Sequence, residues 1–149
     1  MRFMLMMHVG HDDGREVLEW SQTDIANMIE FQRSFDRELE ENGEMVFNAG
    51  LAWPDQARIV RHADGAPAVS DGPFPDGREF LIGFWVVECD SEERAYAIAA
   101  KASSSPGPGG APTDVPIEVR PLKTRNLLLH IPAVILSRKA AAQSVCFHV

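Results

Sequence analysis

Cysteines and basic residues are scarce in this chain of 149 residues. Two cysteines, Cys89 and Cys146, are too few for a disulfide framework; they make at most one bridge, and two free thiols in a reducing cytoplasm are the simpler interpretation. Lysine and arginine total 14 against 22 acidic residues, so the formal net charge is -8. This deficit argues against direct nucleic-acid binding, which depends on basic side chains that neutralise phosphates.

A long apolar segment is also missing. The longest late apolar run, residues 127–136, contains His130 and Pro132 and is roughly half as long as the ~20 residues that a membrane-spanning helix needs. Residues 1–9 are apolar but too short for a signal peptide, and the polar residues 10–14 follow without a small-residue cleavage site. The sequence therefore predicts a cytoplasmic protein that does not enter a membrane.

What is present is the composition of one globular domain, with 45% hydrophobic and 24% charged residues. Apolar runs bounded by turn residues predict β-strands over residues 2–9, 45–49, 57–62, around Val69, 80–87 and 117–120. Gly83, inside the strongest of these runs, indicates a bulge or a close backbone approach. Residues 10–14 and the Ser/Pro/Gly-rich residues 103–112 are expected to be loops.

Two helices are expected between these strands. Helical spacing of apolar residues predicts a helix over 22–42, with a capping signal at Ser21 and Asp24 and an end at Asn42-Gly43. Asp90 and Ser91 cap the second helix. That helix carries a stripe of small and apolar residues that allows close packing on a sheet, namely Ala95, Ile98, Ala99 and Ala102.

This order predicts an α+β fold, a ferredoxin-like βαβ–βαβ sandwich with an inserted hairpin and both helices on one face. The other sheet face would stay apolar, and a homodimer that packs sheet against sheet is the simplest way to bury it. We expect residues 1–121 to form this domain and residues 122–149 to be an extension of unknown structure. The extension has four bases and no acids, whereas residues 1–120 have ten bases and 22 acids.

The motif Asp71-Gly72-Pro73-Phe74 stands among several features that occur in a fixed order along residues 1–121. These features are the opening MRFMLMM, Asn48-Ala49-Gly50-Leu51, Arg78-Glu79, Gly83-Phe84-Trp85 and the closing Ile117-Glu118-Val119-Arg120-Pro121. As a set they resemble the DGPF-type proteins of the YCII-related family. Ala49 stands where that family often has glycine, and PDGRE follows the motif where AETKE is usual.

The resemblance implies a dimeric α+β barrel built from ferredoxin-like units, in agreement with the fold predicted from the residues. It implies no definite activity, because most members have none established. A related branch is proposed to be enzymatic through a His–Asp pair, and a few relatives act on chlorinated aromatic or other small organic substrates. DGPF-type members are often encoded beside extracytoplasmic-function sigma factors, which implies a regulatory or sensing role.

Three residues are candidate acid–base groups. His8 ends the first strand, where it could act as a general base or simply bond to backbone. Asp71 could lock the Gly-Pro turn, hold a pocket mouth as an acid or base, or do both. Glu79 could be a base in a cleft, with Arg78 anchoring an anionic group, or the two could be an exposed ion pair.

Other candidate sites are less specific. Phe74 could contact a ligand, although an aromatic residue there is more often part of a core or dimer interface. His8, His11, Asp12 and Asp13 contain metal-ligand types, but a turn with this spacing is a poor ligand frame, and a solvated polar turn is the simpler interpretation. Cys89 has no neighbouring base to activate it. We therefore predict no metal and no cofactor.

Three hypotheses about function stay open. In the first, the chain is a small-molecule-binding or regulatory module. In the second, it is a cofactor-independent enzyme that uses His8, Asp71 and Glu79 for acid–base chemistry. In the third, the Asp71–Phe74 loop only braces the dimer.

Overall fold

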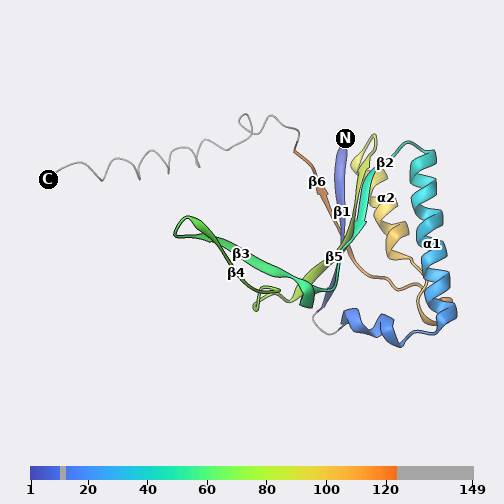
Figure 1. Ribbon diagram of the computed structural model, residues 1–149. Helices are drawn as coiled ribbons and strands as arrows, with labels where there is room; N and C mark the ends of the chain where they lie inside the picture. Colours follow the sequence, from blue (N-terminus) through green and yellow to red (C-terminus); the bar gives the residue numbers. More distant parts are fainter. Residues whose placement is uncertain (11–12, 124–149) are drawn as a thin grey trace.

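The computed structural model describes residues 1–10 and 13–123. Its main sheet has four antiparallel strands in the order β2-β5-β1-β6, and two helices lie together beside one face of it (Figure 1). The strands are β1 (Arg2–Gly10), β2 (Met45–Gly50), β5 (Glu79–Glu88) and β6 (Ile117–Pro121), and the helices are α1 (Gln22–Glu41) and α2 (Glu92–Ser103). This arrangement confirms the predicted ferredoxin-like α+β fold.

Local capping signals set the helix limits. The Ser21 hydroxyl accepts a hydrogen bond of 3.1 Å from the Asp24 backbone N–H at the start of α1. At its end, Asn42 is the C-cap and Gly43 follows with φ of 69°, a conformation that favours glycine. The Ser91 hydroxyl accepts from the Arg94 N–H at 3.2 Å, so α2 begins just after the predicted cap.

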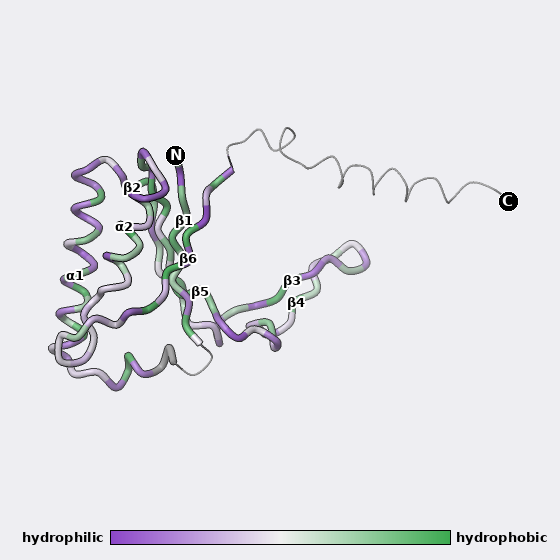
Figure 2. Tube along the Cα trace, turned by 180° about the vertical axis from the view of Figure 1, so that it is seen from behind, coloured by the Kyte–Doolittle hydropathy of each residue, from purple (hydrophilic) through white to green (hydrophobic). Residues whose placement is uncertain are grey.

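The core lies between the sheet and the two helices. Phe3, Leu5 and Val87 of the sheet are fully buried, as are Phe35 and Leu39 of α1. From α2 come the four residues of the predicted stripe, and all four are buried: Ala95, Ile98, Ala99 and Ala102. Figure 2 shows the same division, with hydrophobic residues concentrated in the strands and α1 mostly hydrophilic.

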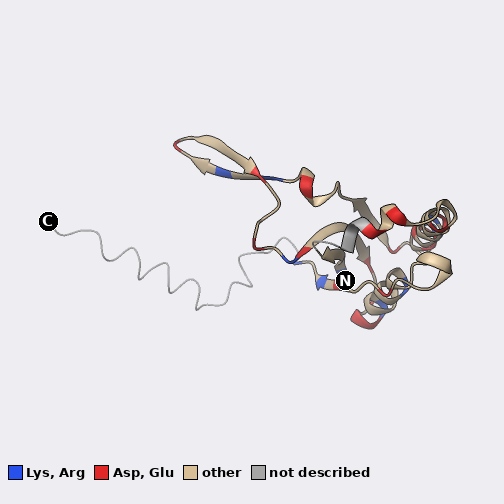
Figure 3. Cartoon of the chain, turned by 90° about the horizontal axis from the view of Figure 1, so that it is seen from below, with Lys and Arg blue, Asp and Glu red and all other residues tan. Residues whose placement is uncertain are grey.

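The inserted hairpin consists of β3 (Arg58–Ala63) and β4 (Ala66–Asp71), which form a separate two-stranded sheet. It projects away from the main sheet, on the side opposite the helices (Figures 1 and 3). Apart from Ile59, its strand residues are exposed. The predicted hairpin is therefore present, but it is an arm rather than part of the main sheet.

Two segments expected to be loops have more structure than the sequence indicates. The 3₁₀ helix η1 (Asp13–Glu19) occupies part of the predicted turn and the residues after it. In the segment after α2, Pro106 and Pro112 form a β-bridge, and the Gly107 N–H donates to the Ala111 carbonyl at 2.7 Å. Each segment supplies part of the pocket described below.

The sheet face away from the helices is called here the open face. Met4 and Met6 of β1 alternate with the core residues Phe3 and Leu5, so they lie on this face, where Met4 is partly exposed and Met6 is 8% exposed. The register places Phe84 and Val86 beside them, and Phe47 of β2 contacts Phe84 with ring centroids 5.8 Å apart. By the same register, Glu118 and Arg120 lie on its β6 edge. The open face is therefore apolar in its middle and charged at one edge.

An ion pair joins α2 to the start of β2. Arg94 donates two hydrogen bonds of 2.6 Å to the carboxylate of Glu44, whose side chain is only 13% exposed. These hydrogen bonds lower the pKa of Glu44, although its burial opposes this. A lowered pKa means that the pair stabilises the fold above the ordinary glutamate range and that this contribution disappears as pH falls through the folded-state pKa.

We therefore expect Arg94→Ala to lower the free energy of unfolding by about 1–2 kcal/mol at neutral pH, because it leaves the largely buried Glu44 carboxylate without its partner. The loss should shrink as pH falls from neutral through the lowered pKa of Glu44, because protonation removes the negative charge that Arg94 neutralises. Urea unfolding at a series of pH values from neutral downward measures this. Lys101→Ala is the control, because Lys101 of the same helix pairs with Glu38 at an exposed site and should cost much less. An equal loss in both variants would contradict the prediction.

Candidate functional site

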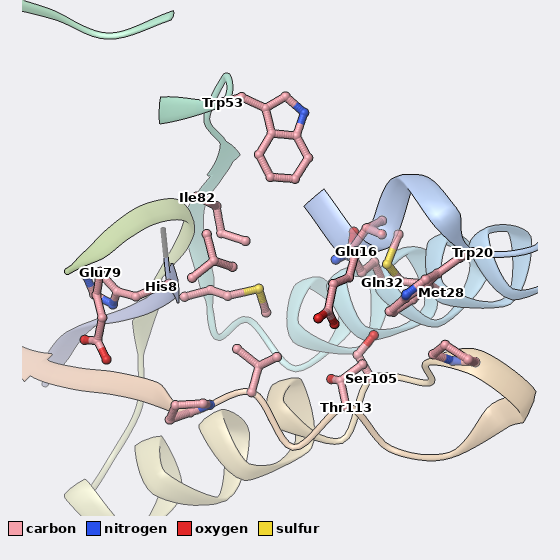
Figure 4. Close-up of a pocket in the computed structure, with 17 residues that line it drawn as sticks. His8, Glu16, Trp20, Met28, Gln32, Trp53, Glu79, Ile82, Ser105 and Thr113 are labelled. Carbon is pink, nitrogen blue, oxygen red and sulfur yellow. The ribbon is translucent and has the colours of Figure 1, made fainter. Parts of the chain in front are cut away.

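A pocket of about 570 Å³ lies at the end of the sheet where β1 finishes and β5 begins. Its walls come from β1 and β5, η1, the first half of α1, Trp53 in the turn after β2, and the segment that follows α2 (Figure 4). Most of the lining is apolar, including Met7, Val17, Met28, Ile82 and Val115. A pocket of this size and character is typical of sites for small organic molecules.

A β-bulge shapes one wall. Met7 pairs with Gly83, but His8 pairs with Leu81, so Ile82 is the extra residue on β5. A Cβ at Gly83 would lie 3.4 Å from the Ala49 carbonyl oxygen on the neighbouring strand. The predicted bulge is thus present, and its extra residue, Ile82, lines the pocket, whereas the contact at Gly83 is an ordinary van der Waals distance and shows no unusually close approach.

At one end of the pocket is a buried hydroxyl. Ser105 is 5% exposed, and its Oγ has no hydrogen-bond partner within the described part of the chain. The Ser105 backbone is fixed, because its N–H donates to the Ala102 carbonyl and its carbonyl accepts from the Thr113 N–H at 2.8 Å. In Figure 4 the oxygen of Ser105 points toward the cavity. A buried polar group without a partner is unfavourable, so this hydroxyl is suited to bonding a bound molecule.

Other polar side chains gather at the same end. In Figure 4 the carboxylate of Glu16, from η1, reaches toward Ser105 and Thr113, and Gln32 of α1 lies behind it. The Thr113 hydroxyl already donates to the Ser103 carbonyl at 3.3 Å. The pocket therefore has one polar end within an otherwise apolar enclosure.

His8 and Glu79, two of the predicted acid–base residues, lie at the opposite edge of the pocket. They stand on paired strands, with Glu79 opposite Gly10 and His8 opposite Leu81. In Figure 4 both side chains point away from the cavity centre, and His8 Nε2 is 3.9 Å from Glu118 Oε2 on the open face. The structure brings these two residues to one rim but does not aim them into the middle of the cavity.

The other predicted site residues lie elsewhere. Asp71 ends β4, is exposed, and is 3.5 Å from Arg58 Nε on β3. Phe74 is 64% exposed and Arg78 is exposed, and neither is among the residues that line the pocket. Pro73 of the same loop lines a second, smaller hollow of about 280 Å³ beside Trp53. Asp71 therefore does not share a cavity with His8 and Glu79.

The metal-ligand hypothesis cannot be followed through in full, because His11 and Asp12 lie outside the described residues, as does Cys146. Within residues 1–10 and 13–123, no cluster of three His, Cys, Asp or Glu could hold a metal ion. Cys89 is buried, and its burial together with the nearby Glu44 raises the thiol pKa, which makes the thiol unreactive. None of the described helices is long and apolar enough to cross a membrane.

Comparison with known proteins agrees with this fold. The model of the YCII-related domain matches residues 1–116. The chain belongs to the YCII-related family. The resemblance seen in the sequence is thus confirmed at the level of the family. A protein of Rhizobium meliloti is 29% identical over 119 residues, which covers 80% of this chain and 92% of that protein. Its name is "uncharacterized protein", so the function of this YCII-related chain must be argued from its own site.

Proposed function

We propose that this YCII-related chain binds a small organic molecule in the pocket between the sheet, η1 and α1. The observation that carries the proposal is a largely apolar cavity of about 570 Å³ whose polar end holds the buried hydroxyl of Ser105, which has no partner among the described residues. Apolar walls supply affinity by removing ligand surface from water, and a few polar groups fix its orientation. A sensing role in a sigma-factor system, as the DGPF resemblance implies, would use such a site without any reaction.

Filling the cavity tests this proposal. We expect Met28→Trp to raise the Kd for the neutral apolar dye N-phenylnaphthylamine at least about tenfold, because the larger ring occupies the space that the dye needs. The measurement is a titration of directly excited dye fluorescence, with circular dichroism as a check on folding.

Ile29→Trp is the matched control. Ile29 is the next residue on α1, is 38% exposed and does not line the pocket, so this variant should bind the dye as the parent chain does. Equal dye affinity in both tryptophan variants would place the bound dye outside the pocket and would overturn the proposal.

A second candidate function is cofactor-independent acid–base catalysis on the bound molecule. One observation favours it: His8 and Glu79 lie at the same rim of the pocket. Binding without reaction is the better supported function, because both side chains point away from the cavity centre and Asp71 is on the hairpin arm. Mass spectrometry of a compound that binds in the pocket distinguishes the two functions. A chemical change in the compound shows catalysis, and an unchanged compound shows binding alone.

We further propose that the chain works as a cytoplasmic homodimer whose copies pack their open faces together. The exposed apolar residues of that face support this, since Phe47 is 54% exposed and sits against Phe84. The folded unit is proposed to be residues 1–121. In support, the last described strand, β6, ends at Pro121.

A further inference from the structure

The charges around the pocket limit what it can hold. Two carboxylates, Glu16 and Glu79, line it, and no Lys or Arg is among the described lining residues. Residues 1–120 as a whole carry ten bases and 22 acids. Both carboxylates are exposed, and an anionic group in the pocket would still meet like charge from them. The pocket is therefore suited to a neutral or cationic molecule and opposes an anion.

The polar end has the right groups for a hydrogen-bond donor that carries positive charge. The Glu16 carboxylate accepts only, and in Figure 4 it faces the same space as the Ser105 hydroxyl. Ser105 Oγ is buried and has an unused accepting capacity within the described residues. One ammonium group carries several N–H donors and could bond to both oxygens at once.

The walls next to this end are aromatic and apolar. Trp20 closes the pocket beside η1, and Trp53 lies across it from Ser105 (Figure 4). Indole faces attract cations as well as apolar surface. Met7 and Ile82, from the sheet, also line the pocket. This wall suits a hydrocarbon or aromatic body attached to the charged group.

We propose that the pocket binds a small organic amine, with its ammonium group between the Glu16 carboxylate and the Ser105 hydroxyl and its apolar body against Met7, Ile82 and Trp53. This inference rests on the proposed binding function and adds the class of ligand and its orientation. The amine nitrogen lies at the polar end, and the remainder of the molecule extends toward the rim with His8 and Glu79.

Three probes of one shape test the inference: phenylbutylamine, phenylbutanol and phenylbutyrate. Each is titrated against the dye-loaded chain near neutral pH, and the Kd is obtained from dye displacement. We expect the amine to bind about tenfold more tightly than the alcohol, because a charge-assisted pair forms, and the acid to bind most weakly of the three.

Variants of the polar residues test which side chains produce the preference for the amine over the alcohol. Glu16→Gln should remove the advantage of phenylbutylamine over phenylbutanol and leave the affinity for phenylbutanol within about twofold. Ser105→Ala should weaken phenylbutylamine about threefold to tenfold. Glu19→Gln is the matched control, because Glu19 ends the same 3₁₀ helix, is exposed and does not line the pocket, and it should keep the full preference.

The failure of this inference is distinguishable from failure of the proposed function. If the alcohol or the acid binds as tightly as the amine, or if Glu16→Gln keeps the preference, the assignment of an amine is wrong while pocket binding stands. A third result also counts against the amine alone. If none of the three probes displaces the dye, while Met28→Trp still weakens dye binding, the assignment of an amine is wrong and pocket binding stands. The proposed function itself fails only by the Met28→Trp and Ile29→Trp comparison.

Discussion

A glutamate in place of Phe84 is expected to convert the chain from paired copies to single ones. Phe84 lies in the middle of the open face, beside Met6 in the register and against the ring of Phe47. In a symmetric dimer the substitution would bury two unpaired carboxylates, one from each copy. We expect the dimer Kd to rise at least about 100-fold, which corresponds to about 3 kcal/mol.

Sedimentation velocity over a range of concentrations measures this effect. Tyr96→Glu is the control, since Tyr96 is 52% exposed on α2, on the far side of the sheet, and should leave the association unchanged. A parent chain that sediments as a single copy at all concentrations would contradict the dimer. So would Phe84→Glu assembling as well as the parent, because the copies would then meet through another surface.

The secondary structure could be predicted because its signals are local. At the start of α1, the Ser21 side chain bonds to a free backbone N–H. At its end, Asn42 is the C-cap and Gly43 turns the chain away from the helix. Each of these signals acts on residues only a few positions away. The apolar run of β5 is long enough to identify a buried strand without knowledge of its partners. The ferredoxin-like order then follows from the sequence of elements, because only a few arrangements bury both helices on one sheet.

The site was harder to predict because irregular segments build its polar end. Glu16 lies on a 3₁₀ helix and Ser105 just beyond the C-cap of α2, and neither position has a periodic pattern or a motif. Trp20, a large aromatic residue next to the Ser21 cap, is the one sequence signal that could have indicated a pocket there. The burial and missing partner of Ser105 depend on how the segment after α2 folds back, which only the structure shows.

Strand ends were a partial guide to the site. His8 and Glu79 come from antiparallel partners, so the end of one strand and the start of the other meet at the same edge of the sheet. The sequence could not show that His8 would face Glu118 on the open face. The acid–base hypothesis places Asp71 with them because it also flanks a strand end, which a ferredoxin-like dimer could bring to the same cleft. The hairpin arm carries it away instead, and it lies near Arg58.

The aromatic contact between α1 and the sheet should dominate the stability of the fold. Phe35 is 2% exposed, and its ring meets that of Trp85 edge to face, with centroids 5.6 Å apart. Trp85 is itself fixed by a hydrogen bond of 2.9 Å from its Nε1 to Asp36 on the next position of α1. We expect Phe35→Ala to lower the free energy of unfolding by about 3–5 kcal/mol, because it removes buried surface and leaves a cavity that this fixed ring cannot fill.

Phe31→Ala is the matched comparison for this prediction. Phe31 stacks on Phe35 at 6.4 Å on the same helix but is only partly buried, so its loss should cost about 1 kcal/mol. Urea unfolding followed by circular dichroism at neutral pH gives both values from the same kind of transition. Equal losses for the two variants would show that the helix is held by the outer part of its apolar stripe rather than by the Phe35–Trp85 contact.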